Sequence, residues 1–267
     1  MVGTRSEATT AIAAGKVNVA GRPAAKAGTL IGPDEPIVMA GPVRRFVSRG
    51  GEKLEAALER FAVPVEGRRA LDAGASTGGF TDCLLAHGAA AVIAVDVGYG
   101  QLDWRLRSDP RVHVMERTNV RDLTAEDLPY RPDLVVADLS FISLEPALTP
   151  LASVATADAE FVLLVKPQFE AGRGNVGRGG VVADPDVWSE VLDRLRDHLR
   201  HRDLIPAGVM ASPLLGPAGN VEFLLHARRD AGHPAAPPTA PASIDAAVHE
   251  GIDLRARQRS RSERSGT

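Results

Sequence analysis

The stretch that decides the fold is Ala70-Leu71-Asp72-Ala73-Gly74-Ala75-Ser76-Thr77-Gly78-Gly79-Phe80-Thr81-Asp82. An apolar run, a glycine-rich turn and the polar beginning of a helix follow one another along it. Glycine has no Cβ, so a ligand can approach the backbone of this turn closely. Ser76 or Thr77 can cap the helix, whose free N–H groups would then face the ligand. The spacing is neither Gly-x-Gly-x-x-Gly nor that of a phosphate loop, so by itself the stretch fits a tight structural turn equally well.

A second feature favours a ligand. The apolar run from Ala90 to Val95 ends in Asp96, about twenty residues after the turn, where a carboxylate accepts hydrogen bonds from ribose hydroxyls in nucleotide-binding α/β sheets. The turn and this carboxylate together predict a site for an adenosine-containing ligand.

Length and composition limit the class of protein. The chain has 267 residues and a net charge of −3, so it can bury a full core, and contacts with nucleic acid must come from local basic patches. No apolar stretch approaches the ~20 residues of a membrane span, and no signal-peptide pattern begins the chain. Cys83 is the single cysteine, and we expect a core residue there, not a nucleophile. These features predict a cytoplasmic protein with no membrane partner.

Apolar strand-like runs alternate with helical patterns from Arg68 onward, which predicts a mostly parallel, seven-stranded α/β sheet with helices on both faces. The predicted strands lie near Ala70, Val92, Val112, 134–137, 161–165, 204–210 and 221–225, and the predicted helices at about 77–87, 144–154 and 186–201. The last two strands lie close together in the sequence and predict a terminal antiparallel hairpin.

The N-terminal region has its own pattern. A short helical pattern covers residues 5–14, an alternating strand-and-turn pattern covers 15–23, and Ile37-Val38-Met39 is a further apolar run. Gly41-Pro42 then opens a linker in which Arg44, Arg45 and Arg49 cluster. These arginines either contact phosphates or form a solvated basic face.

Two further segments stand out. The glycine-rich, basic loop between Phe169 and Asp184 contains Arg173 and Arg178, and its length favours a lid or substrate loop over a slack connection. After Arg229 the chain becomes rich in Ala, Pro, Ser and Arg and is predicted to be a disordered tail.

Four ionisable residues stand at the expected edge of the sheet. Lys53 begins the helix before the first strand of the sheet, Asp138 and Lys166 each end an apolar strand, and Glu222 lies in the last strand. The carboxyl ends of parallel strands share one edge, where such sheets bind their ligands. A lysine in apolar surroundings is costly without a purpose, so a catalytic group competes here with structural ion pairs.

Five motifs resemble those of the TlyA family, in the family's order. They are Ser48-Arg49-Gly50-Gly51-Glu52-Lys53-Leu54, 72–80, Asp138-Leu139-Ser140-Phe141-Ile142-Ser143-Leu144, Lys166-Pro167-Gln168-Phe169-Glu170 and Gly219-Asn220-Val221-Glu222-Phe223. That family joins an S4 RNA-binding domain to a methyltransferase domain of the FtsJ (RrmJ) type. Its members methylate the ribose 2′-oxygen of ribosomal RNA with S-adenosylmethionine and are historically also named haemolysins.

The resemblance implies a domain plan. Residues 1–40 would be a small S4-like α+β domain that is truncated at its N-terminus, because the family's first helix should precede Gly3. Residues 41–52 would be a basic linker, 53–229 a Rossmann-like class I methyltransferase domain, and 230–267 the disordered tail. Ribosomal RNA in ribosomal subunits would be the partner, with a cytidine ribose as the family's target.

The resemblance also implies site residues. Lys53, Asp138, Lys166 and Glu222 match the Lys-Asp-Lys-Glu tetrad of ribose 2′-O-methyltransferases, with Lys166 as the base, Lys53 as its partner at the ribose, Glu222 as an orienting group and Asp138 holding Lys166 near the methyl group. The residues expected to hold the cofactor are Gly74, Ser76, Thr77, Gly78, Gly79, Phe80, Asp96, Val97, Asn119 and Val120, with Asp122 as a rival at the adenine edge. The residues expected to bind RNA are Arg5, Lys16, Arg44, Arg45, Arg49, Arg173 and Arg178.

The chemistry explains these residue types. A ribose 2′-hydroxyl must lose its proton as it attacks a sulfonium methyl in line, and a neutral lysine can accept it. The leaving thioether needs no acid, and no Cys/His cluster for a metal is present in the sequence. An RNA-binding ribosome-assembly factor with vestigial cofactor binding and a membrane-lytic protein remain as alternatives.

Overall fold

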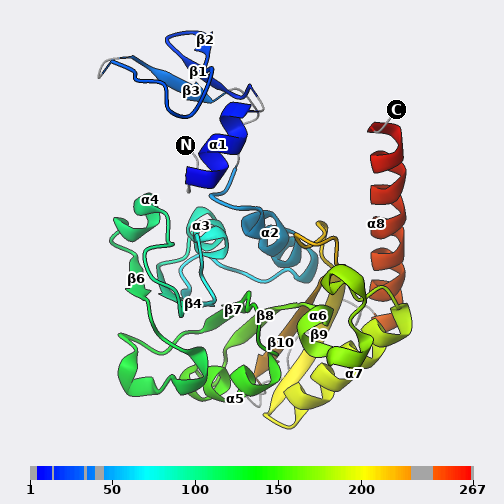
Figure 1. Ribbon diagram of the computed structural model, residues 1–267. Coiled ribbons are helices and arrows are strands. Elements are labelled where there is room, and N and C mark those ends of the chain that lie inside the picture. Colours follow the sequence, from blue (N-terminus) through cyan, green and yellow to red (C-terminus); the bar gives the residue numbers. More distant parts are fainter. Residues whose placement is uncertain (1–4, 14, 33–34, 40–44, 230–242, 266–267) are drawn as a thin grey trace. The chain divides into compact units, whose positions relative to one another are not determined.

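The computed structural model describes residues 5–13, 15–32, 35–39, 45–229 and 243–265. The chain divides into two compact units, Met1–Arg45 and Phe46–Thr267, and each is described here by itself (Figure 1).

The first unit combines one helix with a small antiparallel sheet. Its elements are α1 (Arg5–Ala13), β1 (Val17–Val19), β2 (Arg22–Pro23) and β3 (Ile37–Met39). The strands pair in the order β2-β1-β3, and Ala11 and Val17 are buried. The helix and strands predicted from the sequence are confirmed, whereas the S4-like identity of this unit stays a prediction.

The predicted linker requires a correction. Gly41, Pro42 and Arg44 lie outside the described residues, but Phe46 is buried in the core of the second unit. A Cβ on Gly51 would collide with the Phe46 ring, so the glycine pair allows this ring to pack against the helix that follows. The second half of the predicted linker is therefore part of the folded domain.

The second unit contains a seven-stranded sheet in the described part of the chain. Its strands are β4 (Arg69–Ala73), β5 (Ala91–Val95), β6 (Val112–Met115), β7 (Leu134–Ala137), β8 (Glu160–Val165), β9 (Leu204–Ala211) and β10 (Phe223–Arg229). The order is β6-β5-β4-β7-β8-β10-β9. The first five strands are parallel, and β10 is antiparallel to both β8 and β9. The predicted Rossmann-like sheet and terminal hairpin are confirmed.

Helices cover both faces of this sheet (Figure 1). They are α2 (Arg49–Phe61), α3 (Gly79–Ala86), α4 (Trp104–Arg107), α5 (Glu145–Val154), α6 (Pro167–Glu170), α7 (Pro185–Arg200) and α8 (Ile244–Ser265). Alternate residues of each strand enter two separate cores, as the pleat requires. In β4, Ala70 joins the core beneath α2 and α3, while Leu71 joins the core beneath α5, α7 and α8. Cys83 is buried in the first of these cores, as expected.

The chain reverses its direction of sheet building at β4. It adds β5 and β6 on one side of β4 and then returns to place β7 on the other. Ligands bind at such a switch point, outside the carboxyl ends of the strands. The glycine turn follows β4 there, and Asp138 follows β7.

The tail prediction is wrong for residues 244–265, which form the helix α8. Ile244, Ala247 and Val248 are buried, and α8 packs against α7 and β9. A composition rich in Ala and Arg indicates disorder when no apolar stripe is long enough to form a core. Here a short stripe suffices because α7 and β9 cover its apolar residues.

Candidate active site

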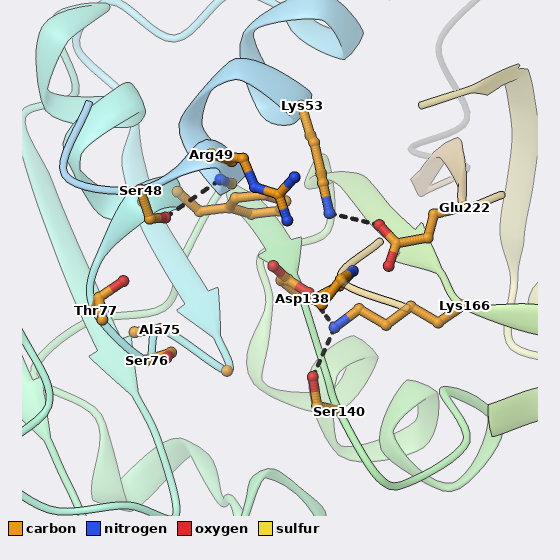
Figure 2. A pocket seen from close by; sticks show the side chains of 15 residues that line it. Ser48, Arg49, Lys53, Ala75, Ser76, Thr77, Asp138, Ser140, Lys166 and Glu222 are labelled. Atoms are coloured by element: carbon orange, nitrogen blue, oxygen red, sulfur yellow. Dashed lines mark hydrogen bonds and ion pairs between the residues drawn. The ribbon is translucent and has the colours of Figure 1, made fainter. Parts of the chain in front are cut away.

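A cavity of about 240 Å³ opens at the switch point (Figure 2). It is lined by Ser48, Arg49, Gly50, Lys53, Gly74, Ala75, Ser76, Thr77, Gly79, Phe80, Asp138, Ser140, Lys166, Pro217 and Glu222. All four candidate catalytic residues are among them, although they come from four separate segments of the chain. The structure therefore brings together the residues that the sequence placed at one sheet edge.

Lys53 and Glu222 form one ion pair of the site. Lys53 Nζ lies 2.5 Å from Glu222 Oε2, and the exposed fractions of the two side chains are 8% and 1%. Glu222 directly precedes β10, so it lies one residue before the strand in which the sequence placed it. Burial of both charges makes each depend on the other, because either one alone would be an uncompensated charge.

Lys166 and Asp138 form the second ion pair. Lys166 Nζ lies 2.6 Å from Asp138 Oδ1 and donates a hydrogen bond of 2.7 Å to Ser140 Oγ. Asp138 directly follows β7, and Lys166 directly follows β8, which are adjacent strands. The predicted contact between Asp138 and Lys166 is present, whereas Ser140 was not predicted although it lies in one of the quoted motifs.

The N-terminus of α2 positions Lys53. Ser48 caps this helix, and its Oγ accepts a hydrogen bond of 3.2 Å from the N–H of Gly50. Gly79 at the beginning of α3 leaves room for the Ser48 hydroxyl, which a Cβ there would displace. The small residues at both helix starts thus let α2 and α3 meet at the mouth of the cavity.

The glycine turn after β4 requires its first glycine. Gly74 has a φ of +85°, and a Cβ on it would lie 2.6 Å from the carbonyl oxygen of Asp138. Ser76 also has a positive φ, of +48°, and its N–H donates a 2.7 Å hydrogen bond to Asp96 Oδ2. The second oxygen of Asp96 accepts a hydrogen bond from the N–H of Gly98. Asp96 therefore holds the turn in shape.

The predicted cofactor residues divide into two groups. Gly74, Ser76, Thr77, Gly79 and Phe80 line the cavity. The other five do not line it. Gly78 packs against Leu102 and Leu106, and Asp96 holds the turn. Val97 is 68% exposed, Asn119 caps a short 3-10 helix (Val120–Asp122), and Val120 is buried in the core. The side chain of Val120 packs in the core. Contact of Asn119, Val120 or Asp122 with the adenine edge stays a prediction.

The predicted RNA-binding residues are scattered. Arg49 lines the cavity, and Arg5, Lys16, Arg45 and Arg178 are exposed. Arg44 and the side chain of Arg173 lie outside what the structure describes. The glycine-rich loop folds into two short 3-10 turns, Arg173–Asn175 and Arg178–Gly180. RNA contact by these residues, and a lid movement of the loop, stay predictions.

Asp72 is a buried acid behind the turn that the sequence analysis quoted without a role. It is 0% exposed, and its Oδ2 accepts a 2.6 Å hydrogen bond from Thr81 Oγ1 of α3. Burial, the larger cause, raises the pKa of Asp72 to about 7, against the lowering effect of the Thr81 hydrogen bond. The pair joins β4 to α3 and so fixes both sides of the glycine turn.

Glu170 and Phe141 are two further residues that the sequence analysis did not single out. Glu170 is buried; its carboxylate accepts hydrogen bonds from Ser143 Oγ at 2.6 Å and from the N–H of Leu144 at 2.7 Å. It thereby ties α6, which follows Lys166, to the loop that follows β7. In that loop Phe141 is 88% exposed and has a φ of +67°, and its ring lies tilted against that of Phe169, with 5.5 Å between the ring centroids.

Neither a metal site nor a membrane span is found in the described part of the chain. Its His, Cys, Asp and Glu side chains form no cluster of three that could hold a metal ion. Its helices are too short or too polar to cross a bilayer.

Comparisons with known proteins agree with this geometry. The family model of the FtsJ-like methyltransferases matches residues 46–229. The chain is 53% identical over 226 residues, 84% of each chain, to the 16S/23S rRNA (cytidine-2′-O)-methyltransferase TlyA of Mycobacterium tuberculosis. The structure of a hemolysin-named protein from Streptococcus thermophilus superposes with a TM-score of 0.78 at 37% identity, covering 97% of this chain and 94% of that one.

A more distant structure shares the fold alone. An S-adenosylmethionine-dependent methyltransferase from Listeria monocytogenes superposes with a TM-score of 0.52 at 14% identity, over 68% of this chain and 98% of that one. With the family model and the close relatives in agreement, this chain belongs to the FtsJ-like methyltransferase family and, within it, to the TlyA proteins.

Proposed function

We propose that this protein transfers the methyl group of S-adenosylmethionine to the 2′-oxygen of a ribose, that of a cytidine, in ribosomal RNA. The observation that carries the proposal is the convergence of two lysines and two carboxylates on one cavity beside the glycine turn. The choice of a cytidine in ribosomal RNA as the substrate follows the name of the relative in Mycobacterium tuberculosis.

The turn fits the cofactor. Backbone and small side chains from Gly74 to Thr77 line one wall of the cavity, where an amino-acid carboxylate could approach the N-terminus of α3. Asp96 is only half-buried, so its remaining lone pairs can accept hydrogen bonds from ribose hydroxyls. When bound, S-adenosylmethionine supplies the electrophilic methyl group on its sulfonium.

Lys166 is the proposed base. Its amine reaches the cavity between Asp138 and Ser140 (Figure 2), so in its neutral form it can accept the proton of the ribose O2′ as that oxygen attacks. Asp138 and Ser140 hold the Nζ atom in place, and the carboxylate stabilises the ammonium that forms. The proton of the O2′ hydroxyl thus passes to Lys166 while the methyl group passes to O2′. No further acid is needed, because the thioether leaves as a neutral group.

Lys53 is the proposed partner at the ribose. Glu222 holds its ammonium at the cavity wall, where it can stabilise negative charge that develops on O2′. Phe141 is the proposed platform for the target base, since an exposed aromatic ring beside the catalytic loop can stack on a nucleobase that is turned out of its helix.

Two alternatives differ in what they need. A cofactor-binding assembly factor without turnover would have no need of two ion pairs on the cavity wall. A membrane-lytic protein would need an apolar surface for lipid, and no described helix can span a bilayer.

Three assays separate these functions. We expect the protein to transfer tritiated methyl from S-adenosylmethionine to ribosomal subunits that lack the modification, and a map of ribose methylation with and without this gene to identify the nucleotide. Leakage from liposomes, measured in parallel, should equal the buffer control. Cofactor binding without any transfer to either subunit would support the assembly factor instead.

A further inference from the structure

The C-terminal helix α8 has two halves of different character. Its first half packs on the domain, with Ala247 1% exposed. Its second half, residues 254–265, carries five arginines and one glutamate in a chain whose net charge is −3. We call residues 254–265 the α8 arm.

The first half is anchored behind the active site. A Cβ on Gly251 would lie 2.8 Å from Val221, the residue before Glu222. Glu250 Oε2 accepts a hydrogen bond from the N–H of Ala211, and Glu250 Oε1 pairs at 3.0 Å with Arg60 of α2, the helix that bears Lys53. The base of the arm therefore has a fixed position relative to the Lys53–Glu222 pair.

The arm extends from this base as regular helix (Figure 1). At 1.5 Å per residue it reaches about 20 Å beyond Gly251. Arg255 donates a hydrogen bond of 2.9 Å to the carbonyl oxygen of Ala183, at the end of the glycine-rich loop that carries Arg178. The arm and the basic loop are thus joined at one point.

Several arginines elsewhere in the domain have their charge compensated by a neighbouring carboxylate. Ion pairs of this kind are formed by Arg68, Arg105, Arg111, Arg196 and Arg200.

Arg257 and Arg259 are exposed, and no ion pair of either is found among the side chains that the structure describes, which in α8 end at Ser260. The pKa of Arg255 is lowered, first by burial and then by the charge of Arg259. Positive charges that repel one another at a fixed site are stabilised when a polyanion approaches.

We propose that the α8 arm is an RNA-binding surface, separate from the cavity, that holds phosphates of the ribosomal RNA substrate about 20 Å from the base of the arm. The proposal rests on the proposed function, because that function makes RNA the substrate. Because the arm is already helical, Arg257 and Arg259 can bind phosphates without first ordering the backbone, and contacts with phosphates give affinity without sequence specificity.

The test compares three double variants as full-length proteins. Arg257→Gln/Arg259→Gln removes two exposed charges from the arm, and Arg257→Lys/Arg259→Lys keeps them. Arg196→Gln/Arg200→Gln removes two charges from α7, each paired with a carboxylate of the same helix, and controls for the loss of positive charge away from the arm. Each is assayed for methyl transfer to unmodified ribosomal subunits and for binding to refolded ribosomal RNA over a range of salt concentrations.

We expect the Gln variant of the arm to raise KM for subunits about tenfold, with kcat and cofactor affinity unchanged. The dependence of log K on log salt should become shallower by roughly 1.5, because two phosphate contacts are lost. The Lys variant and the α7 control should resemble the wild type in both measurements.

Two results would overturn the proposal. One is a KM and a salt dependence of the Gln variant that equal those of the wild type, and the other is an equal change in the α7 control. If the wild type transfers no methyl group, the proposed function fails, and the binding of refolded ribosomal RNA still decides whether the arm contacts RNA.

Discussion

Lys53 Nζ and Glu222 Oε2 lie 2.5 Å apart although 169 residues separate them in the chain. Lys53 is held by the first turns of α2, and Glu222 is held by the hairpin that closes the sheet, where its carbonyl accepts a hydrogen bond from the N–H of Ser212. The pair joins the beginning of the catalytic domain to its end. The site therefore forms only when the whole sheet is assembled, and it is sensitive to changes in either element.

Replacing Lys166 by methionine should remove activity and keep cofactor binding. The methionine retains the packing of the side-chain stem but cannot take the proton, so kcat should fall by about 10²- to 10⁴-fold. Methyl transfer to ribosomal subunits measures the loss, and calorimetric titration measures cofactor affinity. The Ser140→Ala variant, which removes one hydrogen bond to Nζ, should lose about tenfold or less. Turnover of the Lys166→Met variant near the wild-type rate would exclude this residue as the base.

The buried pair should show strong coupling in stability. Lys53→Met and Glu222→Gln each leave one charge without its partner and should each lower the free energy of unfolding by about 3–5 kcal/mol. The double variant removes both charges and should be more stable than the sum of the single losses implies, yet inactive. Denaturation in urea checks this cycle, and additive losses would contradict a direct interaction.

The glycine turn should not tolerate a side chain at Gly74. Both Gly74→Ala and the matched Gly67→Ala place an alanine at positive φ, which costs roughly 1 kcal/mol, but a Cβ on Gly67 meets open space. Gly74→Ala also drives a Cβ against the Asp138 carbonyl, so it should cost about 1–3 kcal/mol more and abolish cofactor binding. Thermal unfolding and titration with the cofactor distinguish the two variants. Equal losses of stability and of cofactor affinity in the two variants would mean that the contact between a Cβ at position 74 and the Asp138 carbonyl is not responsible.

Asp72 should make stability depend on pH. Its pKa is about 7 in the folded protein and 3.8 as the ordinary value, so between these values the native state binds a proton that the unfolded chain has lost. The contribution of this group to stability is therefore full below about pH 4, decreases as the pH rises, and is lost above about pH 7.

The Asp72→Asn variant cannot ionise and keeps an acceptor for Thr81. It should be more stable than the wild type at pH 8, by up to about 4 kcal/mol, and equal to it near pH 4. Urea denaturation at several pH values tests this expectation. A constant difference across that range would show that the carboxyl does not titrate there.

Glu170 should act by positioning the loop after β7. Glu170→Ala removes the acceptors of Ser143 and Leu144, at a cost of about 1 kcal/mol for each hydrogen bond, and should lower kcat while cofactor affinity stays unchanged. Glu170→Gln can still accept the N–H of Leu144 and should retain most activity. An inactive Gln variant would mean that the charge, and not the hydrogen-bonded geometry, is required.

Much of the fold could be predicted because local sequence carries its signals. The apolar strands and the turn at Gly74 each depend on residues next to one another. The predicted cap of α3 by Ser76 or Thr77 is wrong, because Gly78 is the N-cap of this helix and the cap makes no side-chain hydrogen bond.

Asp138 and Lys166 could also be placed together, because each follows a parallel strand and the carboxyl ends of such strands share one edge. Lys53 and Glu222 are assigned to the same site by the resemblance to the TlyA family. The roles of Ser140 and Glu170 could not be predicted, since each depends on a partner from a segment that is distant in the sequence.

The sequence by itself determined the order of the strands and helices and the residue types of the site, because apolar periodicity and glycine placement act within a few residues. Only the tertiary structure decided that Glu222 pairs with Lys53, that Ser140 accepts a hydrogen bond from Lys166, and that residues 244–265 are a helix. Hydrogen bonds, ion pairs and burial at those positions arise between segments that are far apart in the chain, so no local pattern contains them.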